Sequence, residues 1–176
     1  MNEEVASQAQ TGADDNPLSS FIHSDLVVVG LEANDKEEVV RKLAAMLLEK
    51  GYVKESYANA VLAREKLFPT GLPTQDVHVA IPHTDVEHCI KPAIAVAILK
   101  KPVEFFEMAT LDKVVHPEII FLLSIVRPKD QVEWLQRLVS LFQQEGFLAE
   151  LRKSKDAASC YQLLYSSLED LKEQGV

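Results

Sequence analysis

The sequence predicts an α+β protein with α/β/α layers, in which a mixed parallel and antiparallel sheet of about five strands is flanked by helices. Three observations support this fold class. A β-branched run precedes two helical segments, several apolar segments of strand length follow, and amphipathic helices close the chain. The length of 176 residues and the 47% share of hydrophobic residues suit one domain with a proper core.

The first expected elements are a short strand and two helices. Residues 26–29 form a β-branched run that Gly30 ends, which predicts a strand. Asn34 or Asp35 can cap the following helix, and Gly51 ends it. Apolar side chains recur in this helix at helical spacing: Val39, Val40, Leu43, Leu47 and Leu48. A second helix is expected over residues 56–67, with Pro69 and Gly71 stopping it and with three inward side chains: Tyr57, Val61 and Leu62.

Four segments are then expected to be strands: residues 77–81, 94–99, 103–106 and 119–125. The last is apolar at both odd and even positions, which is typical of a central strand covered on both faces. After Pro128, residues 131–144 predict an amphipathic helix with these core side chains: Val132, Trp134, Leu135, Leu138, Val139 and Phe142. Residues 147–151 and 157–171 complete the helical end.

Composition limits the classes of function. The net charge of −9 argues against a nucleic-acid partner, which requires basic surfaces, and it suits docking to a protein with a basic face. No apolar stretch reaches the length of a membrane helix, and no apolar signal segment begins the chain, so a cytoplasmic protein without membrane insertion is expected. Residues 1–16 predict a flexible acidic tail, and Cys89 and Cys160 predict two reduced thiols.

The most informative segment is residues 64–85. It holds an arginine, a turn with Thr70 and Gly71, a short apolar strand, and His83 directly after Pro82. A neutral imidazole is a good nucleophile near pH 7 when one ring nitrogen is free and the other donates a hydrogen bond. The arginine supplies a permanent charge with a bidentate fork for phosphoryl oxygens, so the segment contains the groups that can receive and hold a phosphoryl group. The alternatives are a surface histidine after a turn and an arginine paired with a distant carboxylate.

This segment resembles the IIA (EIIA) components of the bacterial sugar phosphotransferase system (PTS), in the fructose–mannitol superfamily. The turn at residues 69–72, Pro-Thr-Gly-Leu, and residues 81–85, Ile-Pro-His-Thr-Asp, look most like the galactitol-type proteins. The resemblance extends over residues 17–171 and implies an EIIA type-2 domain at residues 17–176, with a sheet flanked by helices.

The resemblance implies a phosphocarrier without a metal or cofactor. Phospho-HPr would donate the phosphoryl group to Nε2 of His83, with Nδ1–H anchored, and a cysteine of the cognate EIIB would accept it while membrane EIIC imports the sugar. Arg64 would stabilise the phosphoryl charge. Docking would use an apolar ring around the histidine: Leu67, Phe68, Leu72 and Ile81.

Four further residues near the motif have expected supporting roles. The Thr70 hydroxyl could bind the phosphoryl group and Gly71 could let backbone N–H groups approach it, unless the two only form a helix stop and turn. Thr84 could donate a second hydroxyl. Asp85 would repel a phosphoryl group but could orient the imidazole or, as we favour, cap a short helix.

Mannitol-type proteins carry a second active-site histidine, which the resemblance would put at the start of the last central strand. Glu118 rather than His116 falls nearest that position here, so a second catalytic histidine is not expected, although His116 could have a supporting role.

Three other functions stay open. The domain could be regulatory, like the nitrogen-related IIA proteins, with phosphorylation state as its output, or it could be an interaction module that is never phosphorylated. A zinc site at His78, His83, His88 and Cys89 is disfavoured by the spacing of these residues. The sugar cannot be read from this sequence, and galactitol is an analogy from the turn at residues 69–72.

Overall fold

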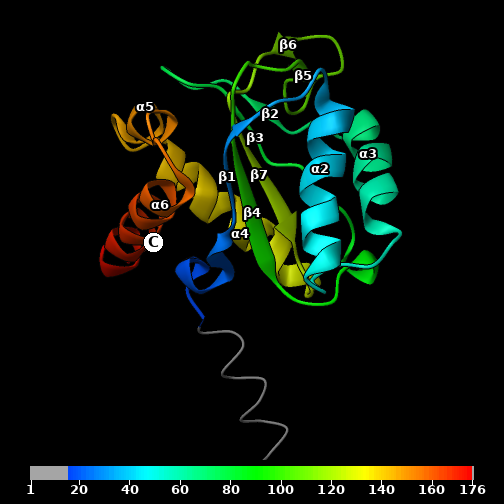
Figure 1. Cartoon of the computed structure of the whole chain (residues 1–176), viewed down its shortest axis with the longest axis horizontal. Helices are drawn as coiled ribbons and strands as arrows, with labels where there is room; N and C mark the ends of the chain where they lie inside the picture. The colour runs from blue at the N-terminus through cyan, green and yellow to red at the C-terminus, as the bar shows by residue number, and fades with distance from the viewer. Residues whose placement is uncertain (1–15, 176) are drawn as a thin grey trace, which may run out of the picture.

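The computed structural model describes residues 16–175, so the predicted tail at residues 1–16 lies almost wholly outside the described residues. Its centre is a five-stranded sheet with helices packed on both faces (Figure 1). The strands of this sheet are β1 (Ile22–Leu31), β2 (Gly71–Leu72), β3 (Val79–Ala80), β4 (Ala93–Leu99) and β7 (Ile119–Ser124).

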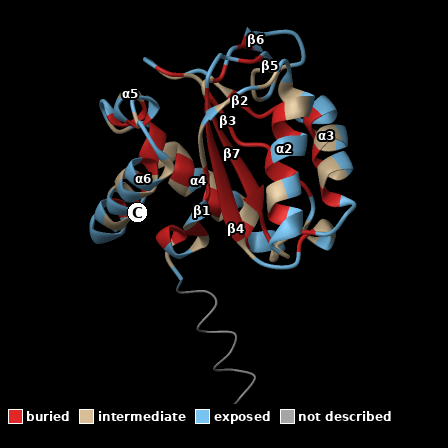
Figure 2. Cartoon of the chain, viewed as in Figure 1, coloured by how far each residue is buried: buried red, intermediate tan, exposed pale blue. Residues whose placement is uncertain are grey.

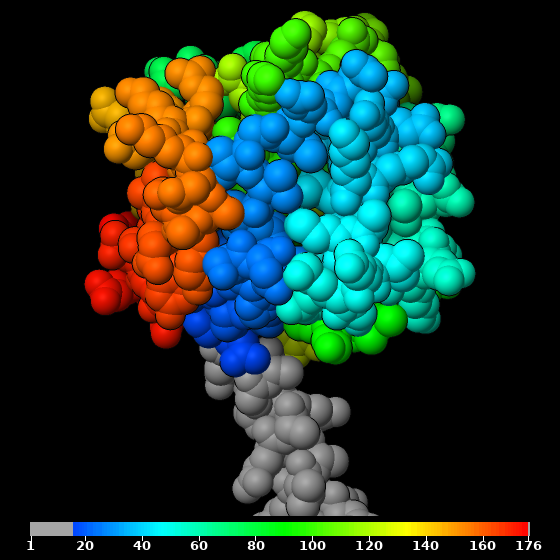
Figure 3. Space-filling model, viewed as in Figure 1, coloured from blue at the N-terminus to red at the C-terminus, as the bar shows by residue number. Residues whose placement is uncertain are grey.

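The strand order is β1-β4-β7-β3-β2. Strand β1 is parallel to β4 and β7 is parallel to β3, whereas β4 and β7 run antiparallel to each other, as do β2 and β3. The predicted fold class, a mixed sheet of about five strands flanked by helices, is therefore confirmed. Figure 3 shows the edge strand β1, in blue, on the surface between the C-terminal helices and the cyan helix that follows it.

Two layers of helices cover the sheet. One face carries α2 (Lys36–Glu49) and α3 (Tyr57–Leu67). The other carries α4 (Pro128–Phe142), α5 (Phe147–Arg152) and α6 (Ala157–Glu173). Two single-turn 3-10 helices, η1 (Leu18–Phe21) and η2 (Val86–His88), complete the helical elements of the described residues.

The core has two halves because every residue of the central strands is buried (Figure 2). In β4, Ile94, Val96 and Ile98 pack toward α4–α6, while the small residues Ala93, Ala95 and Ala97 face α2 and α3. Alternation along a strand separates these two sets, and the alanine methyl groups leave space for the helices on their side. The prediction that residues 119–125 are buried on both faces is confirmed.

The strand boundaries differ from the predicted ones. Residues 103–106 contribute β5 (Phe105–Phe106), which pairs with β6 (Val114–Val115) in a separate two-stranded sheet. Strand β1 begins earlier than predicted and continues past Gly30 with a shift in register. The two-residue strands β2 and β6 are too short to produce an alternating pattern, so the sequence did not predict them.

The helix predictions are largely confirmed. Asp35 caps α2 by accepting a hydrogen bond from the Glu38 N–H, and Trp134 is buried in the core. Two predicted core side chains are instead exposed, Leu48 by 40% and Val132 by 63%, because each lies at the edge of its helix's apolar stripe. No helix within residues 16–175 is both long enough and apolar enough to cross a membrane.

Candidate active site

His83 follows β3 at the end where the chain leaves the sheet. The Pro82 carbonyl still accepts a hydrogen bond from the Leu123 N–H at 3.1 Å, so the backbone just before His83 is fixed to the central strand β7. The His83 side chain is 6% exposed, and its Nδ1 lies 2.9 Å from the Ile81 carbonyl oxygen. A carbonyl only accepts, so Nδ1 carries the proton and Nε2 of the neutral ring keeps a free lone pair.

The surroundings of His83 keep its ring neutral. Burial lowers the pKa of His83 below its usual value of 6.5, the hydrogen bond to Ile81 opposes this, and the positive charge of Arg64 lowers the pKa further. The carboxylate of Asp85 has the smallest influence and raises it. At neutral pH the imidazole is therefore an uncharged nucleophile.

His83 opens into a cleft of about 670 Å³. Arg64 and Thr70 line the same cleft, so the fold brings together three of the predicted site residues. The apolar lining comes from residues 67–69, from the loop at residues 108–111 and from Leu135. Of the predicted docking residues, Leu67 and Phe68 are exposed at this cleft, whereas Ile81 is fully buried and the prediction that it belongs to a docking ring is wrong.

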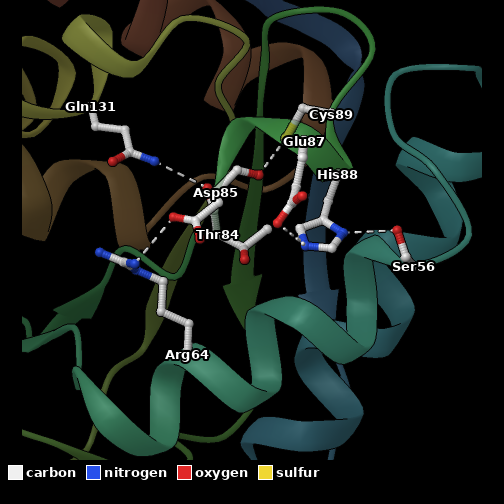
Figure 4. A network of polar contacts seen from close by, with 8 residues as sticks. All are labelled: Ser56, Arg64, Thr84, Asp85, Glu87, His88, Cys89 and Gln131. Carbon is white, nitrogen blue, oxygen red and sulfur yellow. Dashed lines mark hydrogen bonds and ion pairs between the residues drawn. The ribbon is translucent and has the colours of Figure 1, made fainter.

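Arg64 lies in the last turn of α3 and reaches toward the segment after His83 (Figure 4). Its Nη1 is 3.4 Å from Oδ1 of Asp85, and its guanidinium lies over the Phe68 ring at 5.2 Å from the centroid. Its Nε is buried without a hydrogen-bond partner, the only such side-chain nitrogen or oxygen among residues 16–175. The guanidinium at the edge of the cleft thus has an N–H group without a hydrogen-bond acceptor.

Asp85 does not have the capping role that we favoured from the sequence. Its backbone stands at the N-cap position of η2, but its side chain makes no capping hydrogen bond. Instead the carboxylate turns toward Arg64, as Figure 4 shows, and pairs with it. The attraction of a guanidinium 3.4 Å away is stronger than that of the weak N-terminus of a single 3-10 turn.

Thr70 is 4% exposed, and its polar groups are already engaged. Both its N–H and its hydroxyl donate to the carboxylate of Glu65, each at 2.7 Å, and its carbonyl accepts from the Ile81 N–H. A hydroxyl has one proton, so while Glu65 is ionised the Thr70 hydroxyl cannot also donate to a phosphoryl group. In this state Thr70 shapes the cleft wall. Glu65 belongs to the Arg-Glu pair of the motif, but the sequence assigned it no role, because a glutamate on a helix is ordinarily solvated.

Glu65 should make stability depend on pH. Burial raises its pKa to about 7, against opposing hydrogen bonds from Thr70 and the charge of Lys36. Because the pKa of Glu65 is higher in the folded state than in the unfolded state, its contribution to the free energy of unfolding is fully present below pH 4.5. This contribution, about 3 kcal/mol in total, is lost as the pH rises through 7. Glu65→Gln mimics the protonated carboxyl, so it should remove this slope.

Denaturant unfolding at pH 5 and pH 8 measures the Glu65 effect. The native chain should lose markedly more unfolding free energy than Glu65→Gln between these two pH values. Identical losses in both proteins would show that Glu65 does not titrate in this range.

Gly71 occupies a position with no space for a side chain. A Cβ there would stand 2.5 Å from the carbonyl oxygen of Phe106 and even closer to Val115. The Gly71 carbonyl accepts from the Met108 N–H at 2.7 Å, which holds the loop that forms one wall of the cleft. Gly71 therefore allows close packing against β5 and β6, and the predicted approach of its N–H group to a phosphoryl group stays a prediction.

Gly71→Ala should destabilise the fold by about 3 kcal/mol, since the clash involves backbone that cannot move without disturbing the sheet. Gly146→Ala is the control, because Gly146 has a left-handed backbone at φ 78° but nothing within 4 Å of an added Cβ. It should cost about 1–2 kcal/mol through strain alone. Equal losses in chemical denaturation would contradict the steric explanation.

Thr84 is buried next to His83 but does not line the cleft. Its carbonyl accepts a hydrogen bond from Nε2 of Gln131 at 3.1 Å, so α4 holds the chain just after His83 (Figure 4). Gln131 could not be predicted from the sequence, because one polar residue near the start of an amphipathic helix gives no signal of its own.

His116 and Glu118 lie away from the site. Ile119 pairs with Val79, whereas Leu123 bonds to Pro82, so the start of β7 is at the opposite end of the strands from His83. The chain from Ile119 to Leu123 spans about 13 Å along the sheet. His116 is exposed, Glu118 pairs with Arg152 at 3.1 Å, and neither can support His83 directly, which corrects the supporting roles considered for them.

A second cleft of about 430 Å³ lies between residues 72–76 and the C-terminal end of α4. It contains Leu72, a predicted docking residue, and not the histidine. Within the described part of the chain, no group of three or more His, Cys, Asp or Glu side chains is arranged to hold a metal ion.

Comparison with known proteins identifies the class. Residues 20–167 match the family model described as "Phosphoenolpyruvate-dependent sugar phosphotransferase system, EIIA 2". The chain therefore belongs to the type-2 EIIA family of the phosphotransferase system, as its motif and its sheet indicate.

Relatives of this chain include both a sugar-specific EIIA component and regulatory proteins. The chain is 30% identical over 124 residues to the galactitol-specific EIIA component of Escherichia coli, covering 69% of this chain and 81% of that protein. It is 33% identical over 131 residues to the transcriptional regulator ManR of Bacillus subtilis, covering 73% of this chain but only 18% of the regulator. A nitrogen regulatory protein of Bradyrhizobium diazoefficiens is 27% identical over 151 residues, covering 84% of this chain and 94% of that protein.

The fold is also that of solved EIIA structures. In the complex of enzyme IIA for mannitol with phosphorylated IIB from Escherichia coli, the matching chain has a TM-score of 0.68 and 23% identity. The match covers 82% of this chain and 96% of the other.

Proposed function

We propose that the chain is a phosphocarrier that accepts a phosphoryl group on Nε2 of His83 and passes it to a further protein of a sugar phosphotransferase system. One observation carries the proposal. Nδ1 of the buried His83 ring is held by the Ile81 carbonyl, which leaves Nε2 as the nucleophile beside the guanidinium of Arg64. Membership in the EIIA family supports the same role.

The transfer requires no proton movement on His83. The Nε2 lone pair forms a bond to phosphorus while the bond between phosphorus and the donor's imidazole nitrogen breaks, and the donor ring keeps that electron pair. His83 keeps its Nδ1 proton, so its ring becomes positively charged and the Ile81 carbonyl stabilises that charge. Arg64 offsets the charge of the phosphoryl oxygens.

The proposed donor is phospho-HPr and the proposed acceptor is a cysteine of an EIIB component, which acts with a membrane EIIC. The solved relative bound to phosphorylated IIB and the galactitol-specific relative support this assignment. Three exposed apolar side chains at the cleft offer a docking surface: Leu67, Phe68 and Leu111. The net charge of −9 favours partners with a basic face. Galactitol is a candidate sugar by similarity alone.

A regulatory output is the second candidate. The similarity to the nitrogen regulatory protein, which covers 94% of that protein's length, favours this output. The similarity to ManR favours it as well. In that case His83 would still be phosphorylated, but the phosphorylated state itself would be the signal.

The test is phosphoryl transfer with purified components: the chain, HPr, the first enzyme of the system and labelled phosphoenolpyruvate. We expect one acid-labile, base-stable label per chain, which EIIB of a galactitol system then removes. Label that no EIIB removes would favour the regulatory output. No label, while a control EIIA accepts normally, would overturn the phosphocarrier proposal.

A further inference from the structure

Arg64 is incompletely bonded in the unphosphorylated protein. Its one carboxylate contact, from Nη1 to Asp85, is long at 3.4 Å, and its buried Nε has no partner. A guanidinium has five N–H donors and prefers a bidentate anion at 2.7–2.9 Å. The present pairing is therefore a weak one that a better anion can replace.

Asp85 is placed to be that replaceable anion. It lies two residues after His83, its side chain is 66% exposed, and it turns to Arg64 without capping η2 (Figure 4). The segment that carries it cannot easily move away, because the Gln131 side chain holds the Thr84 carbonyl and the Cys89 N–H bonds to the Val86 carbonyl. These contacts hold the backbone on both sides of Asp85.

The charges around His83 change strongly when a phosphoryl group arrives. Before transfer, Arg64 and Asp85 balance each other beside a neutral ring. After transfer, a group with nearly two negative charges competes with one carboxylate for the same guanidinium, and it can form the bidentate contact that Asp85 does not make. Asp85 then loses its partner and is left close to the phosphoryl oxygens.

We propose that Asp85 is a positioning residue that pairs with Arg64 in the unphosphorylated chain. When His83 is phosphorylated, Arg64 leaves Asp85 and binds the phosphoryl group. This inference rests on the proposed phosphocarrier function. The pair stabilises the unphosphorylated state, and the released carboxylate repels the phosphoryl group. Both effects weaken retention of the group, so Asp85 raises the tendency of the phosphorylated protein to pass it on.

The alternative is that Asp85 only supports Arg64 in the orientation that phosphate binding needs. The two roles predict opposite signs. If Asp85 only supports Arg64, replacing Asp85 with a neutral residue should weaken phosphorylation of His83. If Asp85 competes with the phosphoryl group for Arg64, the same replacement should strengthen phosphorylation.

The experiment measures the equilibrium of label between phospho-HPr and the native chain, Asp85→Asn and Glu87→Gln. Glu87 is the matched control, because it is an exposed acid on the same turn that contacts His88 and not Arg64. Asp85→Asn should shift the equilibrium toward the phosphorylated chain by about three- to fivefold, the size expected of a partly exposed charge pair, and slow transfer to EIIB similarly. Glu87→Gln should change the equilibrium by less than half as much.

Raising NaCl from about 0.05 M to 0.5 M should shrink the shift, since the effect is electrostatic. An unchanged equilibrium, a shift equal to that of Glu87→Gln, or a shift toward the unphosphorylated chain would overturn the role of Asp85. These outcomes require that the native chain takes up label, so they are distinct from failure of the phosphocarrier proposal, in which the native chain takes up none.

Discussion

His83→Gln is expected to abolish phosphorylation of the chain while leaving it folded. Glutamine is polar and close to histidine in size, but its amide has no nucleophilic nitrogen to replace Nε2. Label from phospho-HPr should therefore fall to background, a larger effect than any substitution elsewhere in the cleft can produce.

His116→Gln is the matched control for this substitution. His116 is exposed and belongs to the opposite end of β7, so the variant should take up label at the native rate. Circular dichroism and thermal unfolding would establish that both variants are folded. Label retained by His83→Gln, or lost from both variants, would show that the phosphoryl group is attached elsewhere.

The native chain should also keep its transfer rate when pH is lowered from 8 to 6.5. Burial lowers the pKa of His83 below its usual value of 6.5, so most of the His83 rings stay neutral and nucleophilic through this range. A rate that already falls by half near pH 7 would show that the ring is protonated more easily than its surroundings imply.

The sequence predicted the fold class because its strongest signals were local. The apolar run of β7 and the helical spacing of Val39, Val40 and Leu43 each identify an element without knowledge of the rest. Strand pairs of two residues, such as β2 with β3, depend on contacts between separate segments, and they are too short for a periodic pattern to predict them.

The site was predictable in part for the same reason. His83, Arg64 and Thr70 stand in one motif, and the fold puts all three at one cleft. Glu65 and Gln131 were missed, because each acts through a backbone or hydroxyl group that only the folded chain brings near. His116 was considered because the resemblance to mannitol-type proteins implies a second active-site histidine near the start of β7, and the parallel register of β3 and β7 removes it from the site.

Arg64→Ala is expected to slow phosphoryl transfer to His83 by about 10²–10³-fold, a loss of about 3–4 kcal/mol of transition-state stabilisation. The guanidinium lines the cleft with His83, and its buried Nε has no hydrogen-bond partner in the unphosphorylated chain. Rapid-quench measurement of label uptake checks the rate. Arg41→Ala, which removes an exposed arginine paired with Glu37 on α2, should have almost no effect.

Arg64→Lys separates the charge of Arg64 from its shape. A lysine keeps the positive charge but lacks both the Nε donor and the planar fork, so it should restore only part of the lost rate, to within about tenfold of the native chain. Full recovery would mean that charge alone matters and that the unpartnered Nε is incidental. No recovery would place the whole effect in the bidentate contact. If Arg64→Ala were no slower than Arg41→Ala, Arg64 would serve only to pair with Asp85, and the cleft would have to stabilise the phosphoryl group by other means.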